Sequence, residues 1–431
     1  MKCRSYPSDF FGSDWGDDDS LPRLRSNDPT LVTLILTSRR LNDQGGESLA
    51  FALKSNSILV SLNLHNNEVW EQGGVALAEA LKFNSTLTLV DLSANGLGER
   101  AGEALAEALK SNSTLTSLDL SLNRVKERGG EALAAVLKSD NTTLMSLNLS
   151  QNDVRERGGV ALADALKFNS ILTSLDLGSN FLEDRGGEAL ADALKSNSTL
   201  TSLQLPFNLL KERAGEALAE AMTFNKALTY LDLSNNLLND SGAELLAEAL
   251  KCNSTLTSLS LSKNSLKERA GEALAEALKY NSSLTSLELG MNRLSERGGE
   301  ALAEGLKFNP ALTFLGLSNN LLDNRTGRAV REALKFNSAL THLRITPNPM
   351  NQQSAQSIIR CVSRNQSNAS LRKCSLFSLL LPFLSPPIES TDPIDISHCF
   401  GLGGGRGAPG GGRGTFRGTG GERGGARGTG R

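Results

Sequence analysis

The sequence predicts an α/β solenoid, in which about twelve repeats of 28 residues stack side by side. In each repeat a short stretch alternates Leu with polar residues, as at 117–121, and an Ala/Leu/Glu-rich stretch follows, as at 129–138. Each stretch has one apolar face that it cannot cover alone, so neighbouring copies must cover one another. The leucines that open the repeats are spaced by 28 residues with one interval of 29, and they are Leu31, Leu59, Leu87, Leu115, Leu144, Leu172, Leu200, Leu228, Leu256, Leu284, Leu312 and Leu340.

The alternating stretch is expected to form a strand whose leucines point into the stack. Leu118 and Leu120 share one face of this strand, whereas Ser117, Asp119 and Ser121 face the other way. Strands from successive repeats would then pair in parallel as one long sheet. The Ala/Leu/Glu-rich stretch has the apolar spacing of a helix. Because helices are wider than strands, we expect a horseshoe with the parallel β-sheet on the concave face and the α-helices on the convex face.

Two asparagines recur in almost every repeat, one after the strand and one after the helix. We expect the first to be structural, because its side-chain amide can bond turn backbone groups and the neighbouring amide. This first set is Asn67, Asn95, Asn123, Asn152, Asn180, Asn208, Asn236, Asn264, Asn292, Asn320 and Asn348. We expect the second to adopt the left-handed conformation that commonly ends a helix. This second set is Asn84, Asn112, Asn141, Asn169, Asn197, Asn225, Asn253, Asn281, Asn309 and Asn337.

The repeat follows the pattern L-x-x-L-x-L-x-x-N-x-L, as in Leu115, Leu118, Leu120, Asn123 and Val125. This pattern is the signature of leucine-rich repeats, and the 28-residue length with a full helix resembles their ribonuclease-inhibitor-like class. The same class is found in NOD-like receptors and in Ran GTPase-activating proteins. The resemblance covers about residues 31–350 and implies the horseshoe fold, while the class itself serves many partners.

Composition divides the chain into four predicted segments. Residues 1–30 form an acidic segment that we expect to be flexible, and residues 31–350 form the repeat domain. Residues 351–400 are expected to be a degenerate C-terminal capping region. Residues 401–431 form a Gly/Arg-rich tail that cannot build a core and is expected to be disordered. The tail is similar to RGG-type segments that bind RNA, and the alternatives are a linker or a gene-model artefact.

The location of the protein is predicted from what the sequence lacks. The N-terminus does not resemble a signal peptide, and the apolar run 376–384 is far shorter than the ~20 residues needed to span a bilayer. The five cysteines lie far apart, which favours reduced thiols over a disulfide framework. We therefore expect a cytoplasmic or nuclear protein with no membrane partner.

The sequence carries no arrangement of residues that is typical of catalysis. It has no Gly-Lys dipeptide and hence no phosphate-binding P-loop, and His65, His342 and His398 form no HExxH motif. We therefore expect no enzyme activity, and no catalytic, cofactor-binding or metal-binding residues. Arginines such as Arg100 and Arg128 recur before the helices, each near a carboxylate. They could form a track for an anionic ligand, but we favour a ladder of ion pairs between adjacent repeats.

The function expected from this fold is a non-enzymatic scaffold or adaptor that binds a partner protein on its concave face. Such a face is too open to enclose a small-molecule substrate. Its middle is acidic, which favours a partner with a basic patch, and a few aromatics interrupt its serines and threonines. The candidate binding residues are Asp91, Asp119, Asp176, Phe207, Tyr230, Asp232, Glu288 and Phe314. The alternative is that these residues only solvate an exposed sheet.

Two other functions stay open at this stage. The resemblance to Ran GTPase-activating proteins implies a regulator of a small GTPase, although the near-identical loops show no singular residue for that activity. An association with RNA is open through the tail only, because the net charge of -2 gives no general reason to bind nucleic acid.

Overall fold

The computed structural model describes residues 19–138 and 143–365, with side chains up to residue 358. Contacts divide the chain into two bodies, 1–384 and 385–431, and every described residue belongs to the first. The tail predicted at 401–431, and most of the capping region predicted at 351–400, therefore lie outside the described residues.

Helices and strands alternate along the described chain, and each strand with the helix after it forms one repeat, numbered by its strand. The elements are α1 (Ser20–Arg25), β1 (Thr33–Ile35), α2 (Asn42–Leu53), β2 (Ser61–Asn63), α3 (Trp70–Leu81), β3 (Leu89–Asp91), α4 (Glu99–Leu109), β4 (Ser117–Asp119), α5 (Lys126–Leu137), β5 (Ser146–Asn148), α6 (Arg155–Leu166), β6 (Ser174–Asp176), α7 (Glu183–Ser196), β7 (Ser202–Gln204), α8 (Glu212–Phe224), β8 (Tyr230–Asp232), α9 (Asn239–Cys252), β9 (Ser258–Ser260), α10 (Glu268–Tyr280), β10 (Ser286–Glu288), α11 (Ser295–Phe308), β11 (Phe314–Gly316), α12 (Asn324–Ala333), β12 (His342–Arg344) and α13 (Gln352–Asn365).

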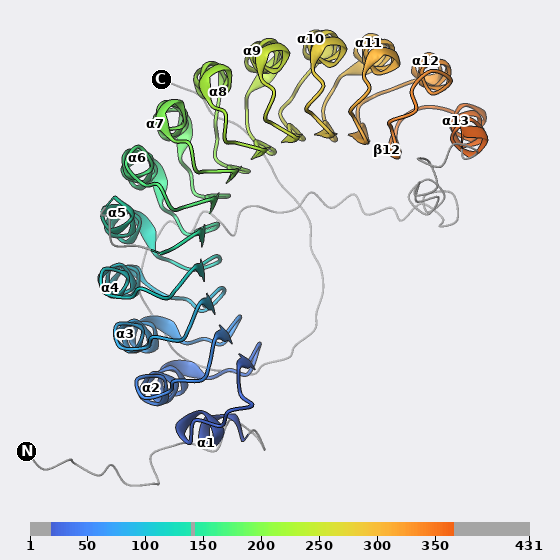
Figure 1. The fold of residues 1–431 in the computed structure, drawn as a ribbon. Helices are drawn as coiled ribbons and strands as arrows, with labels where there is room; N and C mark the ends of the chain where they lie inside the picture. Colours follow the sequence, from blue (N-terminus) through green and yellow to red (C-terminus); the bar gives the residue numbers. More distant parts are fainter. Residues whose placement is uncertain (1–18, 139–142, 366–431) are drawn as a thin grey trace, which may run out of the picture. The chain divides into compact units, whose positions relative to one another are not determined.

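The described strands form one sheet of twelve strands in chain order, and neighbouring strands are parallel. Equivalent residues pair across the sheet, so that Leu118 of β4 lies beside Val90 of β3 and Leu147 of β5. The strands lie on the inner side of the curved stack and the helices on its outer side (Figure 1). The predicted α/β solenoid is confirmed.

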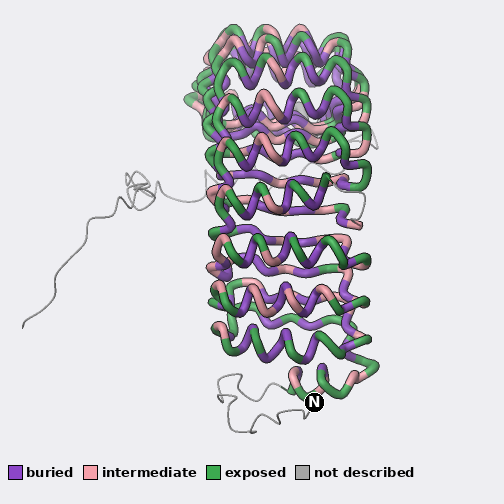
Figure 2. The backbone as a smooth tube through the Cα atoms, turned by 90° about the vertical axis from the view of Figure 1, so that its left-hand side faces the viewer, coloured by how far each residue is buried: buried purple, intermediate pink, exposed green. Residues whose placement is uncertain are grey.

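The core is a continuous layer of leucine and alanine between the sheet and the helices. Leu118 and Leu120 enter it from the strand side and Leu105 from the helix side. Buried residues recur in each successive repeat (Figure 2). Helices α10 and α11 approach so closely that a Cβ atom added to Gly271 would lie 2.8 Å from the Cα atom of Gly298. None of the helices in the described ranges is long and apolar enough to cross a membrane.

The asparagine after each strand bonds backbone groups of two repeats. In repeat 7 the Nδ2 of Asn208 donates to the carbonyl of Leu177 at 2.8 Å and to that of Pro206 at 3.2 Å. Its Oδ1 accepts from the amides of Asn180 at 3.0 Å and Leu182 at 3.3 Å. The predicted structural role is confirmed, and the same bonds recur along the stack.

The asparagine after each helix differs from the prediction. Asn197 is extended, with φ of -76° and ψ of 124°, so the predicted left-handed conformation is wrong. Its Nδ2 donates to the carbonyls of Leu166 at 2.8 Å and Asn169 at 3.0 Å, and its Oδ1 accepts from the amides of Thr199 at 3.0 Å and Leu200 at 2.8 Å. The extended backbone is the one that lets the amide bridge two repeats. The same conformation occurs at Asn225, Asn253, Asn281 and Asn309, whereas Asn141 lies outside the described residues.

The first repeat is covered by helix α1, although we expected residues 1–30 to be a flexible segment. Of that segment, residues 19–30 are described and fold onto the stack. Leu24 is fully buried in the core, and its carbonyl accepts a 2.8 Å bond from Nδ2 of Asn56. Asn27 accepts a further bond from the amide of Ser57. The physical reason for the difference is that a terminal repeat exposes an apolar end that must be capped.

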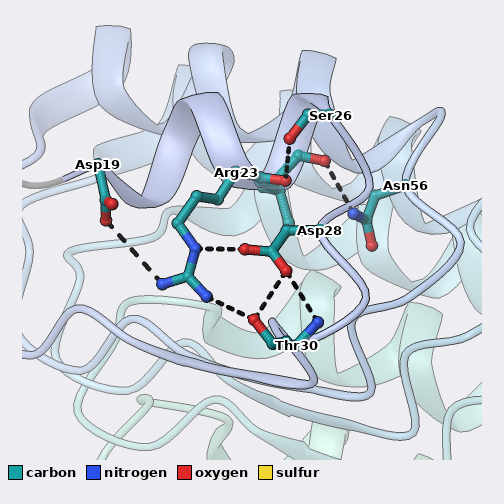
Figure 3. Close-up of polar contacts among 7 residues, drawn as sticks. Asp19, Arg23, Ser26, Asp28, Thr30 and Asn56 are labelled. Atoms are coloured by element: carbon teal, nitrogen blue, oxygen red, sulfur yellow. Dashed lines mark hydrogen bonds and ion pairs between the residues drawn. The ribbon is translucent and has the colours of Figure 1, made fainter.

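A polar cluster fixes the chain between this cap and the first strand (Figure 3). The carboxylate of Asp28 accepts bonds from Oγ1 of Thr30 at 2.7 Å and from the amide of Thr30 at 2.9 Å. Nε of Arg23 donates to the same carboxylate at 2.6 Å. These donors, the Thr30 hydroxyl and amide first, lower the pKa of Asp28 to about 2.

Replacing Leu203 with Ala should lower the free energy of unfolding by about 2 to 5 kcal/mol, because its fully buried side chain lies between two neighbouring leucines of the sheet. Denaturant unfolding measures the change, and Ser202→Ala on the open side of the same strand is the control. If Ser202→Ala destabilises the protein and Leu203→Ala does not, the assigned strand phase is wrong.

The cluster around Asp28 predicts a contribution to stability that depends on pH. A carboxyl whose pKa is lowered on folding stabilises the folded state above its unfolded pKa of about 3.9, and this contribution is lost as the pH falls towards about 2. Asp28→Asn should therefore make the loss of stability between about pH 4 and pH 2 shallower. Unfolding measured across this range tests it, with Asp19→Asn as the control, since Asp19 contacts Arg23 only at 4.0 Å. An unchanged slope for Asp28→Asn would contradict the assignment.

Candidate functional site on the concave sheet

The predicted acidic residues form one row across the concave face. Asp91, Asp119, Asp176, Asp232 and Glu288 are each the last residue of a strand, and each is half-buried. The register places them in line. Asp91 and Asp119 are direct neighbours, and from Asp119 onwards an amide or hydroxyl residue lies on the strand between successive acidic residues. Neighbouring strands lie about 4.8 Å apart, so acidic residues two strands apart are separated by about 10 Å.

Each of these carboxylates also has a structural partner, which the sequence reasoning missed. The Oδ1 atoms of Asp119, Asp176 and Asp232 each accept a 2.8 Å bond from the amide two residues further on. Asn148 makes the same bond at 3.0 Å with a neutral amide side chain. Where the residue at this position has a side-chain oxygen, the turn uses it as an acceptor, and a neutral amide serves as well as a carboxylate. The signal in the sequence was the alternation of Asp with Asn at this position.

The middle of the row carries uncompensated negative charge. None of the ion pairs formed by the described residues involves Asp119, Asp176 or Asp232. Burial raises the pKa of Asp176 above its usual value, and the negative charges of Asp119 and Asp232 add to this shift. The protein thus holds three carboxylates in a half-buried row without a cation among the described residues that pairs with them, and burial of the Asp176 charge opposes folding.

The helices on the convex side are arranged differently, because many of their charged side chains form ion pairs. Arg185 lies 2.9 Å from Glu156 and Arg325 lies 2.6 Å from Glu296, each pair joining adjacent repeats. Equivalent pairs link Arg100 with Glu71, Arg128 with Glu99, Arg157 with Glu127 and Arg297 with Glu268. The predicted ladder of ion pairs is confirmed, with the carboxylate supplied by the preceding repeat. Exposed pairs of this kind contribute at most about 1 kcal/mol each.

Tyr230 stands at the start of β8, on the same face as Asp232. Its neighbours in the sheet are Ser202 and Ser258, so the ring is bordered by small side chains. Burial raises the pKa of Tyr230, and the carboxylates of Asp232 and Asp176 add to the effect. The ring and the acidic row therefore belong to one surface.

The other predicted aromatics lie in different settings. The guanidinium of Arg344 covers the ring of Phe314 at 5.1 Å and lies 3.9 Å from the carboxylate of Glu288. The negative charge of Glu288 is therefore paired with Arg344. Phe207 does not lie on a strand of the concave sheet. It lies in the turn after β7, at the edge where the strands end, with Nζ of Lys263 5.9 Å above its ring.

Within the described ranges, no group of three or more His, Cys, Asp or Glu side chains is placed to hold a metal ion. The acidic row is instead spread over several strands, which suits contact with a large surface. Its side chains can accept hydrogen bonds and attract cations, and Tyr230 can bury apolar area against a partner.

Comparisons with known proteins agree with this architecture. A family model described as Leucine Rich repeat matches residues 83–106, 111–134, 140–163, 168–191, 224–247, 252–275 and 280–303. The fold is similar to that of the crystal structure of the Rad7 and Elc1 complex in yeast, with a TM-score of 0.52 and 21% identity over 75% of this chain and 77% of that chain. An internalin (inlF) from Listeria monocytogenes is also similar, with a TM-score of 0.45 and 21% identity over 82% of this chain and 87% of that chain. No curated protein matches the sequence.

The chain carries leucine-rich repeats, which the family model matches between residues 83 and 303. The length of its repeat and its complete helix fit the ribonuclease-inhibitor-like class that the sequence resembles.

Replacing Asp176 with Asn should increase stability at neutral pH. Asn keeps the oxygen that the turn uses, as Asn148 shows, and it removes a carboxyl group whose pKa is raised on folding. A raised carboxyl pKa opposes folding above the folded pKa, and the effect disappears below the unfolded value of about 3.9. Urea unfolding at neutral pH and below about pH 4 should therefore show a gain that is lost in acid. A variant less stable than the parent at neutral pH would show that folding needs this charge.

Proposed function

We propose that this protein is a non-enzymatic scaffold or adaptor that binds a partner protein with a basic patch on its concave sheet. Asp119, Asp176 and Asp232 attract the partner, and Tyr230 anchors it. The observation that carries the proposal is the row of three carboxylates whose charge the turns do not need and which no described cation neutralises. Negative charge that the protein itself does not pair is complementary to a partner with a basic patch.

The size of the surface supports a protein as the ligand. Twelve strands about 4.8 Å apart extend for roughly 50 Å, which exceeds a small-molecule site. Leucine-rich repeats typically serve as interaction surfaces, and the similar yeast protein Rad7 was crystallised in complex with Elc1. The size of the concave face thus fits the binding of a partner protein.

The proposal is tested by affinity capture of a partner from native cell extract, followed by binding kinetics. Reversal of Asp119, Asp176 and Asp232 to Lys should slow association and weaken its dependence on salt, because long-range attraction is removed. Tyr230→Ala should mainly speed dissociation, since it removes a buried anchor.

The matched control reverses three carboxylates of the convex helices, Glu107, Glu248 and Glu276, to Lys. This control changes the net charge equally and should leave association nearly unchanged. If it abolishes binding while the concave variants bind like the parent, the partner site is on the convex side.

Regulation of a small GTPase is the second candidate, by the resemblance to Ran GTPase-activating proteins. A single-turnover GTPase assay separates it from a scaffold. The scaffold proposal expects no acceleration of GTP hydrolysis when the purified chain is added to small GTPases, including any that it captures. Acceleration would favour the regulator.

A further inference from the structure

Four exposed apolar residues gather at one edge of the sheet, in the middle of the stack. Phe181, Leu209 and Leu237 each directly follow the asparagine after the strand, in repeats 6, 7 and 8, and their exposed fractions are 43%, 41% and 47%. Phe207 lies two residues before Leu209 and is 52% exposed. We call these four residues the edge patch. The equivalent position in other repeats is mostly small or polar, as at Glu68, Gly96, Arg124, Asp153, Ser265 and Arg293, with Leu321 as a further apolar exception.

Folding does not account for the edge patch. Phe181, Phe207 and Leu209 have positive φ angles of 56°, 56° and 59°, a region that bulky residues adopt at a cost of roughly 1 kcal/mol or more. In repeat 3 the position equivalent to Phe181 and Leu209 is a glycine, Gly96, with a φ of 66°. Because the side chains are also exposed, they gain little from burial in the protein itself. Neither backbone preference nor core packing therefore favours large apolar residues here.

The members of the edge patch form a continuous strip. They come from three successive repeats, beside helices α7 to α9 (Figure 1). The amide of Leu237 donates to the carbonyl of Leu210 at 2.7 Å, which ties the turns of repeats 7 and 8 together. Since these turns directly follow strands about 4.8 Å apart, Phe181, Leu209 and Leu237 lie within about 10 Å along the edge. A single apolar segment of a partner can reach all three.

The acidic row reaches this same edge. The carboxylates of Asp176 and Asp232 are held towards the ends of their strands by the amides of Gly178 and Ser234. Phe181 follows Asp176 by five positions, as Leu237 follows Asp232, and that length of chain spans at most about 17 Å. Repeats 6 and 8 thus each combine a carboxylate that forms no ion pair with the described residues and an exposed apolar side chain, no more than about 17 Å apart along the backbone.

We propose that the edge patch, with Asp176 and Asp232, binds a protein segment that carries Lys or Arg close to two or three large apolar side chains. This inference rests on the proposed function and adds the position along the stack and the chemistry of the segment. Charge complementarity supports this occupant, because the two carboxylates attract cations while the strip takes apolar side chains. The carboxylates also disfavour an anionic lipid surface.

The opposite edge of the stack offers a matched control. Phe224 ends helix α8 in repeat 7, and it is 61% exposed. Its replacement removes an exposed apolar side chain from the same repeat as Leu209, at the other end of the helix. The control variant Phe224→Ser and the edge-patch variant Leu209→Ser/Leu237→Ser are both expected to fold. Circular dichroism and thermal unfolding check this.

The test uses the full chain and a phage-displayed library of random peptides as the probe. We expect the selected peptides to contain Lys or Arg within about five residues of large apolar side chains. Synthetic peptides with the selected sequences should bind the double variant Leu209→Ser/Leu237→Ser about tenfold or more weakly than they bind the parent chain. Binding to Asp176→Asn/Asp232→Asn should also weaken and lose its salt dependence, and binding to Phe224→Ser should be unchanged.

The outcomes separate this inference from the proposed function. Peptides that need the two aspartates and not the edge patch overturn the inference and leave a concave site standing. Peptides that bind all variants equally, or a library that yields none, overturn the inference. Self-association of the parent chain that Leu209→Ser/Leu237→Ser abolishes also overturns it, and assigns the edge patch to a second copy of this chain.

Discussion

The stack depends on one constraint, which is that every repeat completes its backbone hydrogen bonds through its neighbours. The side chain of Asn208 bonds groups in its own and the preceding repeat, while its backbone amide donates to Oδ1 of Asn236 in the following one. At the other edge of the sheet, the side chain of Asn197 likewise bonds backbone groups of neighbouring repeats. Because buried peptide groups left without partners cost about 1 to 3 kcal/mol each, the asparagines fix both the spacing and the register of the repeats. The leucine core then fills a space whose dimensions are already set.

Local pattern made much of this fold predictable. The period of two within a strand and the 28-residue repeat determine which leucines are buried, and the structure places Leu118 and Leu120 accordingly. The conformation of Asn197 was not predictable in this way, because left-handed and extended ends suit Asn equally until the neighbouring repeat supplies its bonding partners. The cap formed by α1 was hidden for a related reason, since Leu24 sits in a short polar segment and gains its partners only from the next repeat.

The candidate site shows where sequence reasoning stops. The acidic row was predicted from the alternation of strand residues, and the structure places it in line across the sheet. The turn bond made by each aspartate was missed, although Asn148 at the equivalent position is its signature. The setting of Phe207 depends on a positive φ angle in a turn, which its sequence neighbours do not specify. These differences matter for function, because they separate the side-chain oxygen that the turn uses from the negative charge, which the turn does not use.

The central claim is that each repeat is stabilised by hydrogen bonds to its neighbouring repeats. Backbone hydrogen exchange in the parent and in Asn208→Ala tests it most directly. In the parent, the amides of Asn180 and Leu182 should be protected, because both donate to Oδ1 of Asn208. In the variant, exchange should rise at these two amides of the preceding repeat as well as around position 208 itself. Faster exchange confined to the mutated repeat, with Asn180 and Leu182 as protected as in the parent, would contradict the account.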